Sequence, residues 1–173
     1  GMNKMNLNIV PSNFVKDTIN ALGFDIQNDK TGKKEGVLKN EKPLEVLFEG
    51  VDTNIYKKTN EFSKLLVDEL SQVEEQFSFL YVGHWLQGGL GQDRKDTGML
   101  VKVFCETFKN TSLKNAPALV FKGSGAGFSI MDRDMIQNKI SDILEPYGDN
   151  APNVYLLHGD LSDHEMNSLY NHP

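Results

Sequence analysis

Four short apolar runs, each followed closely by a glycine, limit what this chain can fold into. They cover residues 44–48, 77–82, 118–121 and 154–157. Because the runs are continuously apolar rather than alternating, they are typical of strands covered on both faces of a parallel sheet. The stretches between them at 64–73, 98–109 and 132–144 have helical periodicity. This repeated order predicts an α/β fold with a Rossmann-like doubly wound parallel sheet.

The first part of the chain has a different character. Ser12 is placed to cap a helix that ends near Gly23, and residues 25–42 are polar, lysine-rich and punctuated by glycine. We expect that polar stretch to be a mobile loop. The predicted organisation is therefore a helix and loop over 1–42, followed by a Rossmann-like domain over 43–173.

Composition narrows the class of protein. The 173 residues suffice for one well-filled α/β core, and the formal net charge of −6 argues against a broad basic face that binds nucleic acid. No apolar run approaches the roughly 18 residues of a membrane-spanning helix, and the N-terminus lacks the apolar core of a signal peptide. We expect a cytoplasmic protein that is not transmembrane. The single cysteine, Cys105, lies in a helical apolar pattern and is expected to be buried.

The stretch 77–102 carries the clearest sign of a ligand site. A strand runs into a glycine-rich loop that holds Gly83, Gly88 and Gly89, and Arg94 and Lys95 then precede a helix. Glycine lets the main chain approach a ligand closely, a helix N-terminus presents unpaired N–H groups, and the two cations add positive charge. Ligands of doubly wound sheets bind beyond the carboxyl ends of the strands. We therefore expect a phosphate-bearing ligand at this edge.

Five sequence pieces, taken in order, resemble the nucleotide-sugar-binding half of GT-B glycosyltransferases of the large group-one family. The resemblance covers most of the chain. The pieces are VPSNFVK at 10–16, GVDTNIYK at 50–57, VGH at 82–84 followed by Lys95 and Val103-Phe104, LVFKGSG at 119–125, and NVYLLHGDLSDHEMNSLY at 153–170.

The resemblance implies an enzyme that transfers a sugar from a nucleoside diphosphate sugar to an acceptor hydroxyl, without a metal or other cofactor. Arg94 and Lys95 match the residues that hold the diphosphate and are the candidate catalytic residues. The turn at 159–161 would contact the nucleobase through its main chain. The candidate donor-binding residues are Gly83, His84, Gly88, Gly89, Lys122, Gly123, Gly159, Asp160 and Leu161.

Departures from the family pattern are also present. His84 stands where the family has arginine, the loop before Lys95 is longer, and the acidic segment that holds the donor sugar and ribose lies outside the chain. The resemblance therefore implies a truncated fragment without turnover of its own, whose exposed sheet edge would favour a homodimer. Two alternatives remain: a catalytically inactive Rossmann-like binding or regulatory module, and another doubly wound enzyme such as a nucleotide-binding epimerase.

Other residues are assigned structural roles. Ser162 and Glu165 have the spacing of a capping box, and Trp85 is expected to cover the sheet edge. The histidines at 158, 164 and 172 lack the spacing of a zinc site. The turn at 123–127 does not satisfy the dinucleotide fingerprint, and no P-loop is present.

Overall fold

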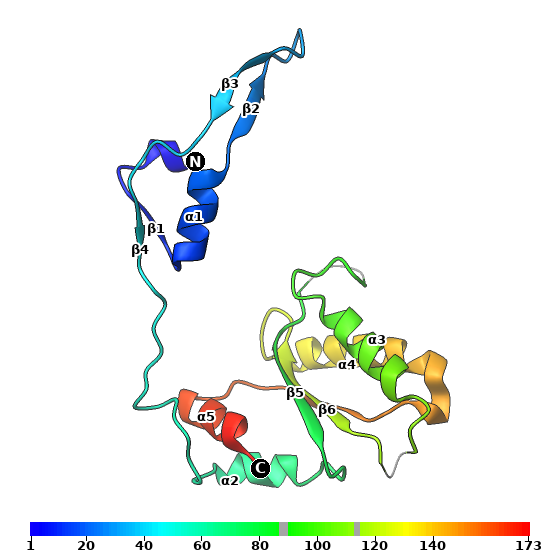
Figure 1. Ribbon diagram of the computed structural model, residues 1–173. Helices are drawn as coiled ribbons and strands as arrows, with labels where there is room; N and C mark the ends of the chain where they lie inside the picture. Colours follow the sequence, from blue (N-terminus) through cyan, green and yellow to red (C-terminus); the bar gives the residue numbers. More distant parts are fainter. Residues whose placement is uncertain (87–89, 113–114) are drawn as a thin grey trace. The chain divides into compact units, whose positions relative to one another are not determined.

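The computed structural model describes residues 1–86, 90–112 and 115–173, and the chain forms two compact units, Gly1–Thr53 and Asn54–Pro173 (Figure 1). Each unit has its own elements. Those of the first are a 3₁₀ turn, one helix and four short strands: η1 (Met2–Lys4), β1 (Asn8–Val10), α1 (Asn13–Ala21), β2 (Phe24–Gln27), β3 (Lys34–Leu38) and β4 (Leu44–Val46).

The N-terminal unit contains one of the strands expected elsewhere. β4 pairs in parallel with β1, with Asn8 opposite Leu44, so the prediction that residues 44–48 join the doubly wound sheet was wrong. An apolar run specifies burial, but it does not specify the partner strand. The predicted cap is confirmed, because the Ser12 side chain accepts a hydrogen bond from the Val15 N–H at 3.2 Å at the start of α1.

The polar stretch predicted as a mobile loop is an antiparallel hairpin of β2 and β3. Its main-chain pairing is accompanied by an ion pair between Lys34 Nζ and Asp25 Oδ1 at 2.6 Å. At the turn, Asn28 Oδ1 accepts hydrogen bonds from the N–H groups of Lys30 and Thr31. Asparagine stabilises turns by this local bonding, so a polar composition is compatible with a defined hairpin.

The C-terminal unit confirms the α/β class with a parallel sheet. Its three strands lie in the order β5-β6-β7, and every residue of the central strand β6 is buried. The elements of this unit are α2 (Lys64–Leu70), β5 (Ser78–His84), α3 (Thr97–Phe108), β6 (Ala118–Ser124), α4 (Ile130–Leu144), η2 (Glu145–Asn150), β7 (Val154–Leu157) and α5 (Asp163–Asn171).

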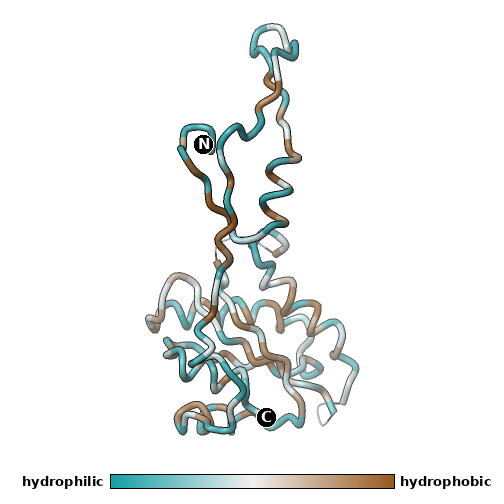
Figure 2. Tube along the Cα trace, turned by 60° about the vertical axis from the view of Figure 1, so that its left-hand side comes forward, coloured by the Kyte–Doolittle hydropathy of each residue, from teal (hydrophilic) through white to brown (hydrophobic). Residues whose placement is uncertain are grey.

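Helices cover both faces of this sheet. α3 and α4 lie side by side on one face (Figure 1), where Trp85, Phe104 and Phe121 belong to one buried cluster with residues of α4. On the other face, Leu80 and Val120 line a groove with side chains of α2 and α5. Figure 2 shows the hydrophobic residues concentrated along the central strands. The predicted burial of Cys105 is confirmed, and Trp85, which was expected to cover the sheet edge, is also buried.

A segment near the start of the C-terminal unit is bound to its last helix. Asn167 Oδ1 accepts a hydrogen bond from the Lys57 N–H at 3.1 Å, and Asn171 Oδ1 accepts one from the Thr59 N–H at 3.2 Å. Asn171 Nδ2 also donates to the Lys57 carbonyl at 3.1 Å. Two asparagines one helical turn apart thus hold a stretch of main chain that is more than a hundred residues away in sequence. We call residues 57–59 the strap.

No helix in the three described ranges is both long enough and apolar enough to pass through a membrane.

Candidate functional site

The carboxyl ends of β5, β6 and β7 meet at one edge of the sheet, because all three strands are parallel. The last residues of β5 and β6 are joined there, since His84 Nδ1 lies 3.2 Å from Ser124 Oγ. The Trp85 N–H continues this connection by donating to the Ser124 carbonyl at 2.8 Å. The chain leaves β5, β6 and β7 at this edge, after His84, Ser124 and Leu157. It is the edge at which the sequence predicts a ligand.

A buried lysine joins two of these segments. Lys122 is 6% exposed, and its Nζ donates to the Gly159 carbonyl at 2.6 Å. Burial lowers the pKa of Lys122, while the carboxylate of Asp160 acts in the opposite direction. Gly159 has φ +136°, a backbone conformation that favours glycine. The structure therefore brings together Lys122, Gly159 and Asp160, three residues that were predicted separately.

Sequence reasoning missed a second connection at this edge. His158 Nε2 and Asp132 Oδ2 lie 3.0 Å apart, and both side chains are more than nine-tenths buried. The Asp132 carboxylate also accepts hydrogen bonds from the N–H groups of Gly125 and Ala126, each at 3.0 Å. Burial raises the pKa of Asp132, but these hydrogen bonds outweigh it and hold the pKa below its ordinary value. These two N–H groups of the glycine turn are therefore already occupied.

The phenyl ring of Phe128 completes the arrangement. Its centroid lies 5.4 Å from Lys122 Nζ and 5.9 Å from the His158 ring. We call Lys122, Phe128, Asp132, His158 and Gly159 the carboxyl-edge cluster. One sequence signal for Asp132 was its position in the first turn of α4, shortly after a glycine turn whose N–H groups need acceptors.

Arg94 and Lys95 lie in the segment between β5 and α3 and are exposed. The Asp96 N–H donates to the Asp93 carbonyl at 2.9 Å and closes a turn around them. Neither cationic side chain forms a hydrogen bond or an ion pair with another residue in the described part of the chain. No contact among the described residues connects them to the carboxyl-edge cluster, and both can meet an anion.

The N-terminus of α3 is less available than the sequence suggested. Asp93 Oδ2 accepts a hydrogen bond from the Thr97 N–H at 3.3 Å. Burial raises the pKa of Asp93, but hydrogen bonds from Thr97 and from the main chain of Lys95 and Arg94 outweigh it and lower the pKa. A carboxylate thus occupies part of the site that a phosphate would need. Anion binding at this end would depend on the two cationic side chains.

The predicted glycines have different roles. Gly83 pairs with Gly123 across β5 and β6, and a Cβ on Gly123 would lie 2.2 Å from the Gly83 carbonyl oxygen. Close strand pairing therefore accounts for glycine at 123 without a ligand. Gly88 and Gly89 lie outside the described residues. Leu161 is half-buried and precedes a capping box of Ser162 and Glu165, which confirms the role predicted for that pair.

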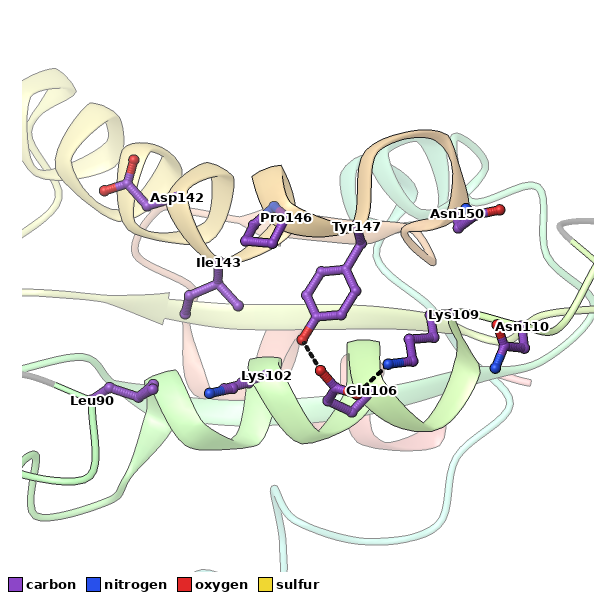
Figure 3. A pocket seen from close by; sticks show the side chains of 10 residues that line it. All are labelled: Leu90, Lys102, Glu106, Lys109, Asn110, Asp142, Ile143, Pro146, Tyr147 and Asn150. Atoms are coloured by element: carbon purple, nitrogen blue, oxygen red, sulfur yellow. Dashed lines mark hydrogen bonds and ion pairs between the residues drawn. The ribbon is translucent and has the colours of Figure 1, made fainter.

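A polar groove of about 570 Å³ lies between α3 and the α4–η2 segment (Figure 3). Glu106 accepts hydrogen bonds from Tyr147 Oη at 2.8 Å and from Lys109 Nζ at 2.6 Å. These two bonds lower the pKa of Glu106, and the bond to Glu106 raises the pKa of Tyr147 to about 12. Neither group is suited to proton transfer near neutral pH, so we do not assign catalysis to this groove.

Metal ligands do not converge in the parts of the chain that the structure describes. No three His, Cys, Asp or Glu side chains are grouped there as a metal ion would require. His158 instead bonds Asp132, and the ring of His172 lies 5.6 Å from that of Phe62.

Comparison with known proteins shows the class of fold. No family model and no curated protein matches the sequence. The structure is similar to trehalose-6-phosphate synthase OtsA, with a TM-score of 0.55, 13% identity and coverage of 95% of this chain and 37% of that chain. It is also similar to the E. coli trehalose-6-phosphate structure bound with UDP-2-fluoro glucose, with a TM-score of 0.52, 14% identity and coverage of 95% and 38%.

These similarities confirm the GT-B, Rossmann-like fold that the sequence resemblance predicted. At this level of identity they show the fold alone. The chain spans less than two fifths of the length of either structure.

Proposed function

We propose that this chain binds the nucleoside diphosphate part of a nucleotide-sugar donor and serves the transfer of a glycosyl group to an acceptor hydroxyl. The observation that carries the proposal is the similarity over 95% of the chain to a structure bound with UDP-2-fluoro glucose. The position of Lys122, Gly159 and Asp160 supports it, because these residues lie together at the carboxyl edge of a parallel sheet, where such folds bind ligands.

Arg94 and Lys95 are assigned to the diphosphate. Both are exposed and have no partner among the described residues, so their positive charges can meet phosphate oxygens. Negative charge builds up on the leaving diphosphate as the glycosidic bond breaks, and fixed cations that bind this charge lower the barrier. In this proposal the two side chains supply that stabilisation and no metal cofactor is needed.

The turn at 159–161 is assigned to the nucleobase. Lys122 bonds the Gly159 carbonyl, so we assign this lysine to holding the turn rather than to contacting phosphate. The N–H groups of Asp160 and Leu161 form no hydrogen bond with another described residue. They are therefore free to donate to a ligand.

Isothermal titration with UDP and GDP tests the proposal. Wild type should bind, and Arg94→Ala with Lys95→Ala should weaken binding at least tenfold, because charge-assisted hydrogen bonds contribute about 1.5–3 kcal/mol each. Lys30→Ala with Lys33→Ala removes the same charge from two exposed positions of the other unit and should leave binding unchanged. A folded wild type that binds neither nucleotide, or a double variant that binds normally, would refute the assignment.

We also propose that the chain forms a homodimer through β5. This strand pairs with β6 on one side only among the described strands. Phe77, directly before it, and Phe79, within it, are 61% and 44% exposed. Unpaired apolar edge strands tend to pair with another chain. Light scattering should show a dimer that Phe77→Lys dissociates, and a monomer at high concentration would contradict the proposal.

A further inference from the structure

One aromatic side chain of the carboxyl-edge cluster is exposed, although its surroundings hold it in place. Phe128 lies in the turn between β6 and α4 and is 46% exposed. It does not belong to the buried core cluster formed with α3 and α4. A phenyl ring left in water at a ligand-binding edge offers a flat apolar surface that the fold does not use for packing.

Two side chains contact this ring and restrict its orientation. The His158 ring meets it at 65°, with the centroids 5.9 Å apart, and Lys122 Nζ lies 5.4 Å from its centroid. The turn that carries it is anchored, because Asp132 accepts the N–H groups of Gly125 and Ala126. A ring held in this way loses little conformational freedom when a ligand binds.

The same contacts place Phe128 beside the 159–161 turn. Lys122 Nζ contacts both the ring and the Gly159 carbonyl, which it bonds at 2.6 Å. His158, which meets the ring edge-on, is the residue directly before Gly159. The exposed aromatic surface and the unpaired N–H groups of Asp160 and Leu161 therefore border the same region.

We propose that Phe128 is the surface on which the nucleobase of the donor stacks, with the main chain of residues 160–161 facing the edge of the base. This inference rests on the proposed function, because it requires a nucleoside diphosphate as ligand. Lys122 occupies one side of the ring, so the base lies against the other. Stacking on an aromatic side chain tolerates every base, so Phe128 contributes affinity and the main-chain groups contribute selectivity.

Titrations with two ligands test this role. Phe128→Ala should weaken UDP binding about tenfold, since stacking on an aromatic side chain is worth about 1–3 kcal/mol per base. It should leave the binding of inorganic pyrophosphate, which has no base, unchanged. Phe128→Tyr keeps an aromatic ring and should restore most of the UDP affinity. Met131→Ala removes another apolar side chain, 83% exposed, and should bind UDP as wild type does.

Each outcome decides between the two proposals. If wild type binds UDP and Phe128→Ala binds it equally well, the stacking role is refuted and the proposed function stands. An equal loss of UDP and pyrophosphate affinity in a folded Phe128→Ala variant would also refute stacking, because a base contact cannot weaken pyrophosphate. If wild type binds no nucleoside diphosphate, both proposals fail.

Discussion

Replacing Asp132 with alanine should destabilise the C-terminal unit severely. The carboxylate accepts hydrogen bonds from two N–H groups of the turn before α4, and it bonds His158 at 3.0 Å. Alanine would remove all three interactions at once. It would leave the N–H groups of Gly125 and Ala126 without an acceptor and the buried imidazole without its partner.

The magnitude follows from the count of lost partners. A hydrogen bond to a charged group contributes about 1.5–3 kcal/mol, and a buried donor left without an acceptor costs about 1–3 kcal/mol. Because these losses overlap at one carboxylate, we expect Asp132→Ala to lower the free energy of unfolding by about 3–5 kcal/mol. Asp132→Asn keeps one acceptor oxygen and should cost about half as much.

Urea unfolding followed by tryptophan fluorescence measures this loss. Trp85 is the only tryptophan of the chain and is 5% exposed in the core of the C-terminal unit, so its signal reports that unit. Asp134→Ala is the matched control. This aspartate is exposed and, among the described residues, forms an ion pair with its neighbour Arg133 alone, so its replacement should cost less than about 1 kcal/mol. A loss for Asp132→Ala no larger than that of the control would refute this reasoning.

Three further outcomes are expected. The pKa of Asp132 is lowered in the folded state, so the ionised carboxylate stabilises the fold. This contribution is complete above the ordinary aspartate pKa of about 3.9 and is lost as the pH falls through the pKa of the folded state. Thermal unfolding at pH about 5 to 2 should therefore show a steeper fall in Tm for wild type than for Asp132→Asn. Gly123→Ala should prevent folding or lower Tm strongly, since its Cβ would lie 2.2 Å from the Gly83 carbonyl, whereas Gly127→Ala, with no atom within 4 Å, should resemble wild type in circular dichroism. Burial raises the pKa of Cys105 to about 11, so Ellman's reagent should modify it only in denaturant, and rapid modification of the native protein would contradict its burial.

Local sequence signals predicted much of the C-terminal unit. The capping box at 162–165 depends on residues that are close in sequence. The three parallel strands depend on the burial of a whole apolar run. The short strand at 44–46 shows the limit, because its apolar run resembles those of the sheet while its partner is β1. The hairpin over 24–38 was not predicted, because its polar composition is typical of a loop rather than of paired strands.

The candidate site was predictable only in part. Lys122, Gly159 and Asp160 were found separately through the resemblance, and their proximity follows from parallel pairing of β6 and β7. The bond between Asp132 and His158 joins residues 26 positions apart and depends on tertiary geometry. Composition and spacing contain no signal that brings these two side chains together. The sequence does show that the N–H groups of a glycine turn need an acceptor, and this points to a nearby carboxylate.

The strap of residues 57–59 affects the order in which the chain acquires its structure. Its acceptors, Asn167 and Asn171, are separated from it by 110 and 112 residues. On a ribosome, the segment that opens this unit therefore emerges long before the helix that binds it. Contacts of such long range are formed late, because loop closure must precede them. The nascent segment consequently remains unbound until α5 has been synthesised, so consolidation of this unit waits for the helix that binds the strap.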